Sequence, residues 1–106
     1  MLYKVKAKFH KDLLLEFFTK LNDGTIERQK PDGLEMIASM KEAKVTAENT
    51  IEWYEQCFCE TPLKHERETV FDTYLYDFQT ILVDEISEDI EGESFWDYMQ
   101  RYLNNA

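Results

Sequence analysis

The sequence predicts an α+β domain in which helices alternate with the strands of an antiparallel sheet, and three stretches carry this prediction. In residues 2–9 apolar side chains alternate with a second set that is lysine except for Leu2, and this period of two is that of a half-buried strand. Residues 50–59 are rich in β-branched and aromatic side chains, which favour strands. Residues 61–78 place apolar side chains at helical spacing, so the apolar segments on both sides of them are expected to be strands.

Length and composition indicate one packed domain. The chain has 106 residues, of which 43% are hydrophobic and 14% aromatic. A chain of this length buries roughly two thirds of the surface that it exposes when unfolded. Its apolar content is too high for a disordered segment of the same charge. We therefore expect residues 1–106 to fold as a single domain.

The charge argues against two classes of partner. The formal net charge is −10, so the phosphate backbone of a nucleic acid and an anionic lipid surface would both repel the protein. Residues 1–44 carry nine Lys or Arg against seven Asp or Glu, whereas residues 45–106 carry three against fifteen. We expect the fold to mix these two halves in space. We expect no nucleic acid and no membrane as a partner.

The expected location is cytoplasmic. The first residues contain no apolar run of signal-peptide length, and no stretch approaches the length of a membrane-spanning helix. The chain has two cysteines and no cysteine framework, which indicates reduced thiols.

A strand and a helix come first along the chain. The strand at residues 2–9 separates its side chains into two faces, Tyr3, Val5, Ala7 and Phe9 against Leu2, Lys4, Lys6 and Lys8. Asp12 is a candidate N-cap for a helix whose apolar stripe runs from Leu13 to Leu21. Gly24 supplies the backbone freedom that a helix end commonly needs. The Pro-Asp-Gly sequence at 31–33 then predicts a turn in a surface loop.

Residues 35–45 fit two structures. Their helix propensity is high, and Asp32 with Glu35 could form a capping box. Against a helix, Met36, Ala38 and Met40 alternate with polar residues. A loop of hairpin length at 46–49 also separates this stretch from the strand at 50–59. We predict a strand for residues 35–45 and keep the helix as the alternative.

A helix is predicted over residues 62–76. Thr61 is a candidate N-cap, and Pro62 suits the first helical position because it has no backbone N–H to leave unpaired. The apolar side chains that fall near one face of this helix are Leu63, Val70, Phe71, Tyr74 and Phe78.

The last third of the chain is predicted to add a strand and a terminal helix. Residues 79–86 are apolar and end in acids, and residues 87–93 form an acidic linker. Ser94 with Asp97 resembles a capping box, before a helix whose apolar face contains Phe95, Met99, Tyr102 and Leu103. We expect residues 1–86 to form the core and residues 87–106 to be the linker and terminal helix.

The predicted order is strand, helix, strand, strand, helix, strand, which is the ferredoxin-like βαββαβ arrangement with an extra C-terminal helix. In this order the chain resembles the dimeric α+β barrel group, whose small ferredoxin-like domains pack two sheets face to face. The resemblance covers residues 1–86 and rests on element order without a shared motif. It implies a homodimer. The group includes cofactor-independent oxygenases, chlorite dismutase relatives, heme-degrading enzymes and domains that only bind ligands or regulate.

His65 is the first candidate for acid–base chemistry. Histidine is the usual general acid or base near neutral pH, and Glu68 or Thr69 at helical spacing could orient it. Arg67 or Tyr54 could then fix an anionic substrate. The alternative is a solvated helix flank held by pairing of neighbouring charges.

A second candidate is a ligand site on the first strand. Lys4, Lys6 and Lys8 form a ladder of ammonium groups that repel one another unless acids stand opposite, and Glu52 or Glu55 could do so. Without such acids the ladder is an anion site. Trp53 and Tyr54 would then make it a pocket for a small anionic ligand.

Cys57 and Cys59 are a third candidate, for a metal or redox site. Their thiols are two apart on a strand and point to the same face as Trp53 and Glu55. His65 is the nearest further ligand, but zinc sites usually show paired cysteine or histidine motifs. We expect no metal and no cofactor.

These patterns predict a small acidic domain that binds a small ligand or a protein partner without catalysis, as a homodimer paired through its sheet faces or its terminal helix. The alternative is a cofactor-independent enzyme, oxygenase- or isomerase-like, that acts on a small anionic substrate in a cavity between helices and sheet. In that enzyme His65 would be the acid or base.

Overall fold

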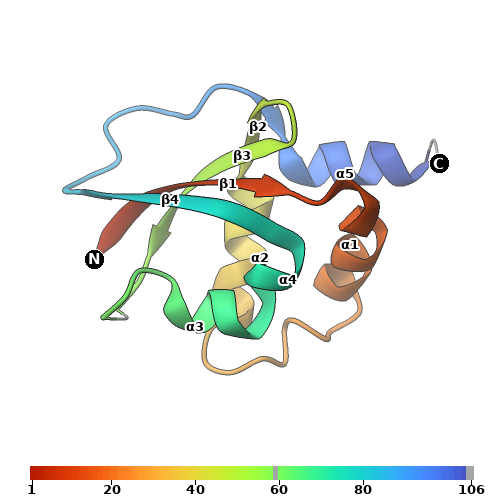
Figure 1. The fold of residues 1–106 in the computed structure, drawn as a ribbon, viewed down its shortest axis with the longest axis horizontal. Coiled ribbons are helices and arrows are strands. Elements are labelled where there is room, and N and C mark those ends of the chain that lie inside the picture. Colours follow the sequence, from red (N-terminus) through yellow and green to blue (C-terminus); the bar gives the residue numbers. More distant parts are fainter. Residues whose placement is uncertain (59, 105–106) are drawn as a thin grey trace.

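The computed structural model describes residues 1–58 and 60–104 and is an α+β domain with an open, five-stranded antiparallel sheet (Figure 1). The strands are β1 (Leu2–Phe9), β2 (Lys44–Ala47), β3 (Thr50–Gln56), β4 (Leu75–Val83) and β5 (Glu93–Ser94). The helices are η1 (Lys11–Leu13), α1 (Leu14–Asn22), α2 (Gly33–Glu42), α3 (Lys64–Glu66), the π-helical segment η2 (Arg67–Phe71), α4 (Asp72–Tyr74) and α5 (Phe95–Asn104).

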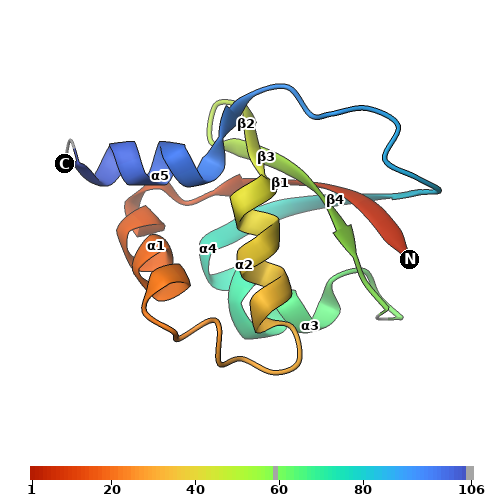
Figure 2. The same cartoon turned by 180° about the vertical axis from the view of Figure 1, so that it is seen from behind.

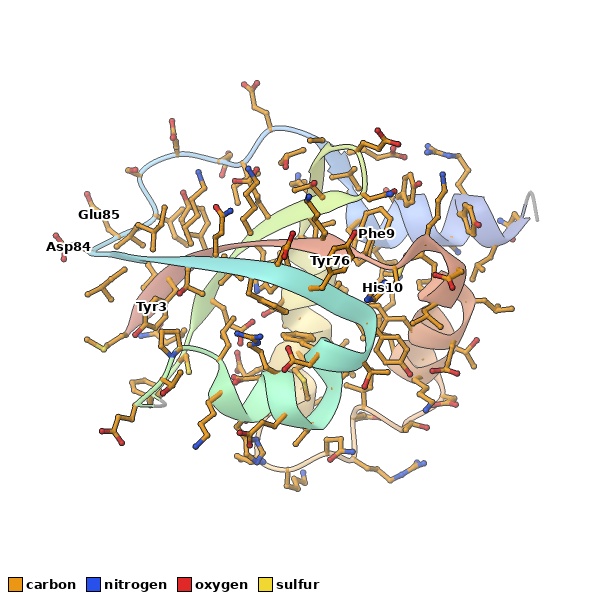
Figure 3. All side chains as sticks on the ribbon, in the orientation of Figure 1. Tyr3, Phe9, His10, Tyr76, Asp84 and Glu85 are labelled. Carbon is orange, nitrogen blue, oxygen red and sulfur yellow. The ribbon has the colours of Figure 1, made fainter. Side chains whose placement is uncertain are left out.

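The sheet has the strand order β4-β1-β3-β2-β5, and every neighbouring pair is antiparallel. The central strand β1 places Val5 opposite Trp53 of β3 and Thr80 of β4. Beyond the end of β1 the ring of His10 stacks on that of Tyr76 with the centroids 4.5 Å apart (Figure 3). This contact adds to the pairing of β1 with β4.

One face of the sheet packs against the helices and forms the core. The predicted alternation of β1 is confirmed, since its apolar face is buried and its lysine face is half-buried or exposed. Helix α2 lies against the sheet, behind β1 and β3 in Figure 1 and in front of them in Figure 2. The largest fully buried side chains are Trp53, Phe9, Phe17, Phe71, Phe95, Leu14, Ile26, Met36, Met40, Ile51, Leu63 and Leu75.

The strand predicted for residues 35–45 is wrong, because most of that stretch is helix α2. Its buried side chains Met36 and Met40 are separated by four residues, and Ala43 follows three residues later. This is helical spacing, although the same residues also fit an alternating pattern. The strand that the prediction expected here, β2, is four residues long and begins only at Lys44.

The helix predicted over residues 62–76 is confirmed in its centre and wrong at its start. Leu63 adopts left-handed backbone angles with φ of 57°, so the helical turns begin at Lys64, beyond the predicted cap at Thr61. They end at Tyr74, because Leu75 is extended and opens β4. The last predicted strand therefore begins four residues earlier and ends three residues earlier than the predicted range 79–86.

The segment after β4 returns across the molecule and joins the core. Figure 3 shows Asp84 and Glu85 at the tip where β4 ends. The chain then runs to β5, which pairs with β2, and to α5, which packs against α1 and α2. The predicted cap of α5 is confirmed, since Ser94 Oγ accepts the backbone N–H of Asp97 at 3.2 Å. Within residues 1–58 and 60–104, no helix has both the length and the apolar character needed to cross a membrane.

Candidate functional site

A cleft of about 830 Å³ opens where the end of β3 meets the first turns of α2 and α3. The side chains that line it come from three segments far apart in the sequence: Pro31, Asp32 and Glu35; Gln56, Cys57 and Phe58; and His65 and Glu66. This cleft brings acidic, imidazole and apolar groups together.

Asp32 and His65 form the most direct polar contact in the cleft. Asp32 Oδ2 lies 2.6 Å from His65 Nδ1. An ionised carboxylate can only accept hydrogen bonds, so Nδ1 carries the proton and the lone pair of the neutral ring is on Nε2. In that form Nε2 can accept a hydrogen bond from a ligand.

The backbone around α2 fixes the position of Asp32. Asp32 is the N-cap residue of α2, yet its side chain makes no capping hydrogen bond and contacts His65 instead. The next residue, Gly33, lies so close to the preceding loop that an added Cβ would be 2.2 Å from the carbonyl oxygen of Ile26 and 2.7 Å from that of Glu27. Only glycine fits this contact, which anchors the residue that holds His65.

Glu66, which lines the cleft, forms a buried carboxyl pair with Glu55 behind it. Glu55 is 2% exposed and Glu66 is 3% exposed. Oε1 of Glu55 accepts the indole N–H of Trp53 at 2.8 Å and the hydroxyl of Ser39 at 2.9 Å. The Oε2 atoms of Glu55 and Glu66 are both buried and find no donor among the described residues.

Burial raises the pKa of Glu55 from 4.5 to about 8. The hydrogen bonds from Trp53 and Ser39 act in the opposite direction, because they stabilise the carboxylate. The neighbouring carboxyl of Glu66 raises the pKa of Glu55 further, by repulsion and by accepting a hydrogen bond from the protonated form. A proton on Glu55 thus supplies the donor that the two Oε2 atoms otherwise lack.

His65 and Glu66 belong to the short helix α3, which precedes a wide helical turn. The backbone N–H of Leu63 donates to Cys57 Sγ at 3.4 Å, which ties the start of α3 to the end of β3. Four residues after His65, the hydroxyl of Thr69 donates to the His65 carbonyl at 2.8 Å. The π-helical segment η2 follows Glu66 directly, and π turns often occur at functional sites.

Of the residues proposed as catalytic from the sequence, only His65 lines the cleft. Arg67 lies over the ring of Phe78 at 4.5 Å and pairs with Asp72 at 2.8 Å. The hydroxyl of Tyr54 donates to the carbonyl of Glu88 at 3.2 Å, beside the acidic linker. The structure therefore does not bring Arg67 or Tyr54 to His65.

The residues proposed for ligand binding are divided between the two faces of the sheet. Trp53 is buried on the helix face, where it holds Glu55. Lys4, Lys6 and Lys8 lie on the opposite face. Lys4 is 3.9 Å from Glu52, as one of the alternatives expected, and Lys8 is 3.7 Å from Asp77. These four residues do not form one pocket.

The structure tests the cysteine site only in part. Cys57 is buried at the inner wall of the cleft, and Cys59 lies outside the residues that the structure describes. In the described part of the chain no cluster of three or more His, Cys, Asp or Glu side chains has the arrangement of a metal site.

The sequence reasoning missed Asp32, Glu55 and Glu66 as members of the site. One of them left a signal, because strand alternation placed Glu55 on the same face as Trp53, and a carboxyl on a buried face requires a reason. Asp32 left no such signal, since it is 33 residues from His65.

Comparisons with known proteins give no further guide: no family model, no curated protein and no solved structure matches this chain. The structure contains one chain, so the homodimer stays a prediction.

Proposed function

We propose that this protein is a ligand-binding domain that takes up a small organic cation with an apolar group in the cleft beside His65. The observation that carries the proposal is the charge of the cleft. Of the described residues that line it, Asp32, Glu35 and Glu66 are acidic and none is Lys or Arg. A low-dielectric cleft lined by one sign of charge concentrates ligands of the opposite sign.

The remaining lining suits an apolar group next to the positive charge. The side chain of Phe58 is 86% exposed at the rim, and Pro31 lies at the start of α2. A cation with an aromatic group could cover the exposed Phe58 ring, which otherwise faces water. His65 Nε2 would accept a hydrogen bond from the same ligand.

Matched aromatic probes of opposite charge test this proposal. Benzylamine and benzoate are titrated separately into the ¹⁵N-labelled protein at pH 8, and backbone amide shifts are recorded. We expect benzylamine to shift the amides of Gln56, Phe58 and His65, and benzoate to leave them unchanged. Equal shifts with both probes, or shifts with benzoate alone, would contradict a cation site. Glu35→Gln is expected to weaken benzylamine binding by removing one charge from the rim.

Proton-transfer catalysis is a second candidate, favoured by one observation. A histidine with an oriented lone pair lines the cleft, and Glu55, whose pKa is raised to about 8, lies behind it against Glu66. Proton-transfer catalysis needs one group that acts as a base and one that acts as an acid, and the environment of each group sets its role. The assay is exchange of C–H hydrogens of aminoacetone in D₂O, and we expect exchange that His65→Gln abolishes. Exchange at the rate of buffer alone would exclude this activity toward aminoacetone.

We also infer a ferredoxin-like topology for the core. Its support is the order β4-β1-β3-β2, with helices in the connections from β1 to β2 and from β3 to β4. A fifth strand extends this order at the β2 edge. We further propose that two copies pair through the open sheet face, where Ile81 is 61% exposed. Light scattering at micromolar concentration should then give twice the chain mass of 12.7 kDa, and the single-chain mass would refute the dimer.

A further inference from the structure

The buried carboxyl pair beside the cleft depends on a proton for its hydrogen bonding. Oε1 of Glu55 is satisfied by Trp53 and Ser39, but Oε2 of Glu55 and Oε2 of Glu66 have no donor among the described residues apart from a proton on the pair itself. Buried oxygen atoms without donors are unfavourable and uncommon in folded proteins. Glu66 also lines the cleft, and since its Oε2 atom is buried, a ligand that reaches this oxygen has to displace the side chains that cover it.

We propose that the Glu55–Glu66 pair is the subsite for a primary ammonium group, and that the ammonium replaces the proton held between the two carboxyl groups. The exchange is balanced, because one ligand cation enters and one proton leaves to solvent. An ammonium group has three N–H donors, enough to serve both Oε2 atoms. This inference rests on the proposed cation site and names the residues that bind the ammonium group.

The groups that surround Glu55 and Glu66 limit the exchange of a proton for an ammonium group to this pair. The groups that face Glu55 are the indole N–H of Trp53 on its own strand, the hydroxyl of Ser39 on α2 and the carboxyl of Glu66 on α3. Tyr3 of β1 is its partner across the sheet, and the Tyr3 hydroxyl donates to Met1 Sδ at 3.6 Å.

The Cys57 thiol is buried in the wall of the cleft, and the remaining titratable groups are more exposed than the pair. Asp32 and His65 are paired with each other, and Glu35 is exposed. No Lys or Arg is among the described residues that line the cleft, so the ligand itself has to bring the positive charge.

Proton release gives a measurable signature. With the pKa of Glu55 at about 8, the fraction of the pair without its proton rises about 50-fold from pH 6 to pH 8. The affinity for an ammonium ligand should rise by about the same factor, because the proton competes for the site. A cation held only by rim charges would not show this dependence on Glu55.

The experiment measures the dissociation constant of benzylamine by amide-shift titration at pH 6, 7, 8 and 9, for the wild type and two variants. Glu55→Gln keeps the oxygen that accepts from Trp53 and Ser39, and its NH₂ group can donate to Glu66 at every pH. This variant therefore imitates the protonated pair, and its folding is checked from its amide spectrum. Glu35→Gln is the matched control, because it removes a cleft carboxyl group outside the pair.

We expect the wild type and Glu35→Gln to bind benzylamine about 50-fold more tightly at pH 8 than at pH 6. We expect Glu55→Gln to bind weakly, with most of this pH dependence lost. Benzylamine binding that is as tight and as pH-dependent in Glu55→Gln as in the wild type would overturn the subsite and leave the proposed function standing. No benzylamine binding by the wild type at any of these pH values would overturn both.

Discussion

The stability of this protein should fall as the pH rises from 5 to 9, and Glu55→Gln should remove most of that fall. The folded protein holds a proton on Glu55 up to about pH 8, whereas the unfolded chain loses it near pH 4.5. Between these values the folded state binds more protons than the unfolded state. The contribution of this proton to the free energy of unfolding is therefore fully present below pH 4.5 and is lost as the pH rises through 8.

The size of the effect follows from the two pKa values of Glu55. With pKa values of 4.5 unfolded and about 8 folded, linkage gives a loss of about 4 kcal/mol in the free energy of unfolding between pH 5 and pH 9. Domains of this size have total stabilities of about 5 to 15 kcal/mol. A loss of this size would be a large part of the total. In Glu55→Gln the amide cannot ionise, so the variant should match the wild type at pH 5 and exceed it at pH 9.

Urea unfolding followed by tryptophan fluorescence measures this difference, at pH 5, 6, 7, 8 and 9 for both proteins. The fluorescence of Trp53 is a suitable probe because its indole N–H bonds to Glu55. Glu35→Gln, which changes an exposed carboxyl group of the same cleft, should keep the wild-type slope. Parallel stability curves for the wild type and Glu55→Gln across this range would refute the claim that folded Glu55 keeps its proton up to about pH 8.

Three other variants test the architecture of the site. Gly33→Ala should cost about 1 to 3 kcal/mol in urea unfolding, because its Cβ would meet the backbone at 2.2 Å; unchanged stability would contradict this close approach. Asp32→Ala should free the His65 ring to move its proton from Nδ1 to Nε2, visible in ¹⁵N ring shifts at a pH where the ring is neutral; an unchanged tautomer would show that Asp32 does not set it. Tyr74→Phe removes a hydroxyl that donates to Glu16 at 2.7 Å and should cost about 1 kcal/mol, and equal urea midpoints would mean that this bond contributes nothing.

The sequence predicted the strands better than the helices that shape the cleft. Strand β1 alternates between a buried and a solvated face, and a shift of one residue would exchange those faces, so its pattern has one solution. Helix α2 was predicted as a strand because Met36, Ala38 and Met40 fit both periods. The burial of Met36 and Met40 on one helical face decides between them.

The site was predictable only where its chemistry lies in one short stretch. His65 could be selected from its residue type, but its expected partners Glu68 and Thr69 were chosen by local helical spacing. Its carboxylate partner is Asp32, which lies in the predicted loop but directly before α2, and most of α2 was predicted as a strand. The importance of Glu55 depends on how deeply it is buried, and burial follows from packing by segments distant in the sequence.

The wide turn after Glu66 makes the site sensitive to chain length. The backbone N–H of Asp72 reaches back five residues to the carbonyl of Arg67, so this turn contains one residue more than an ordinary helical turn. Each residue of a regular helix rotates the chain by about 100°. The wide turn holds its extra residue without rotating its flanks, so deleting an exposed residue there, such as Glu68, would give an ordinary turn and leave Glu66 facing Glu55. Deleting a residue from an ordinary turn of the same segment would instead rotate Glu66 away from Glu55, although both residues of the carboxyl pair were still present.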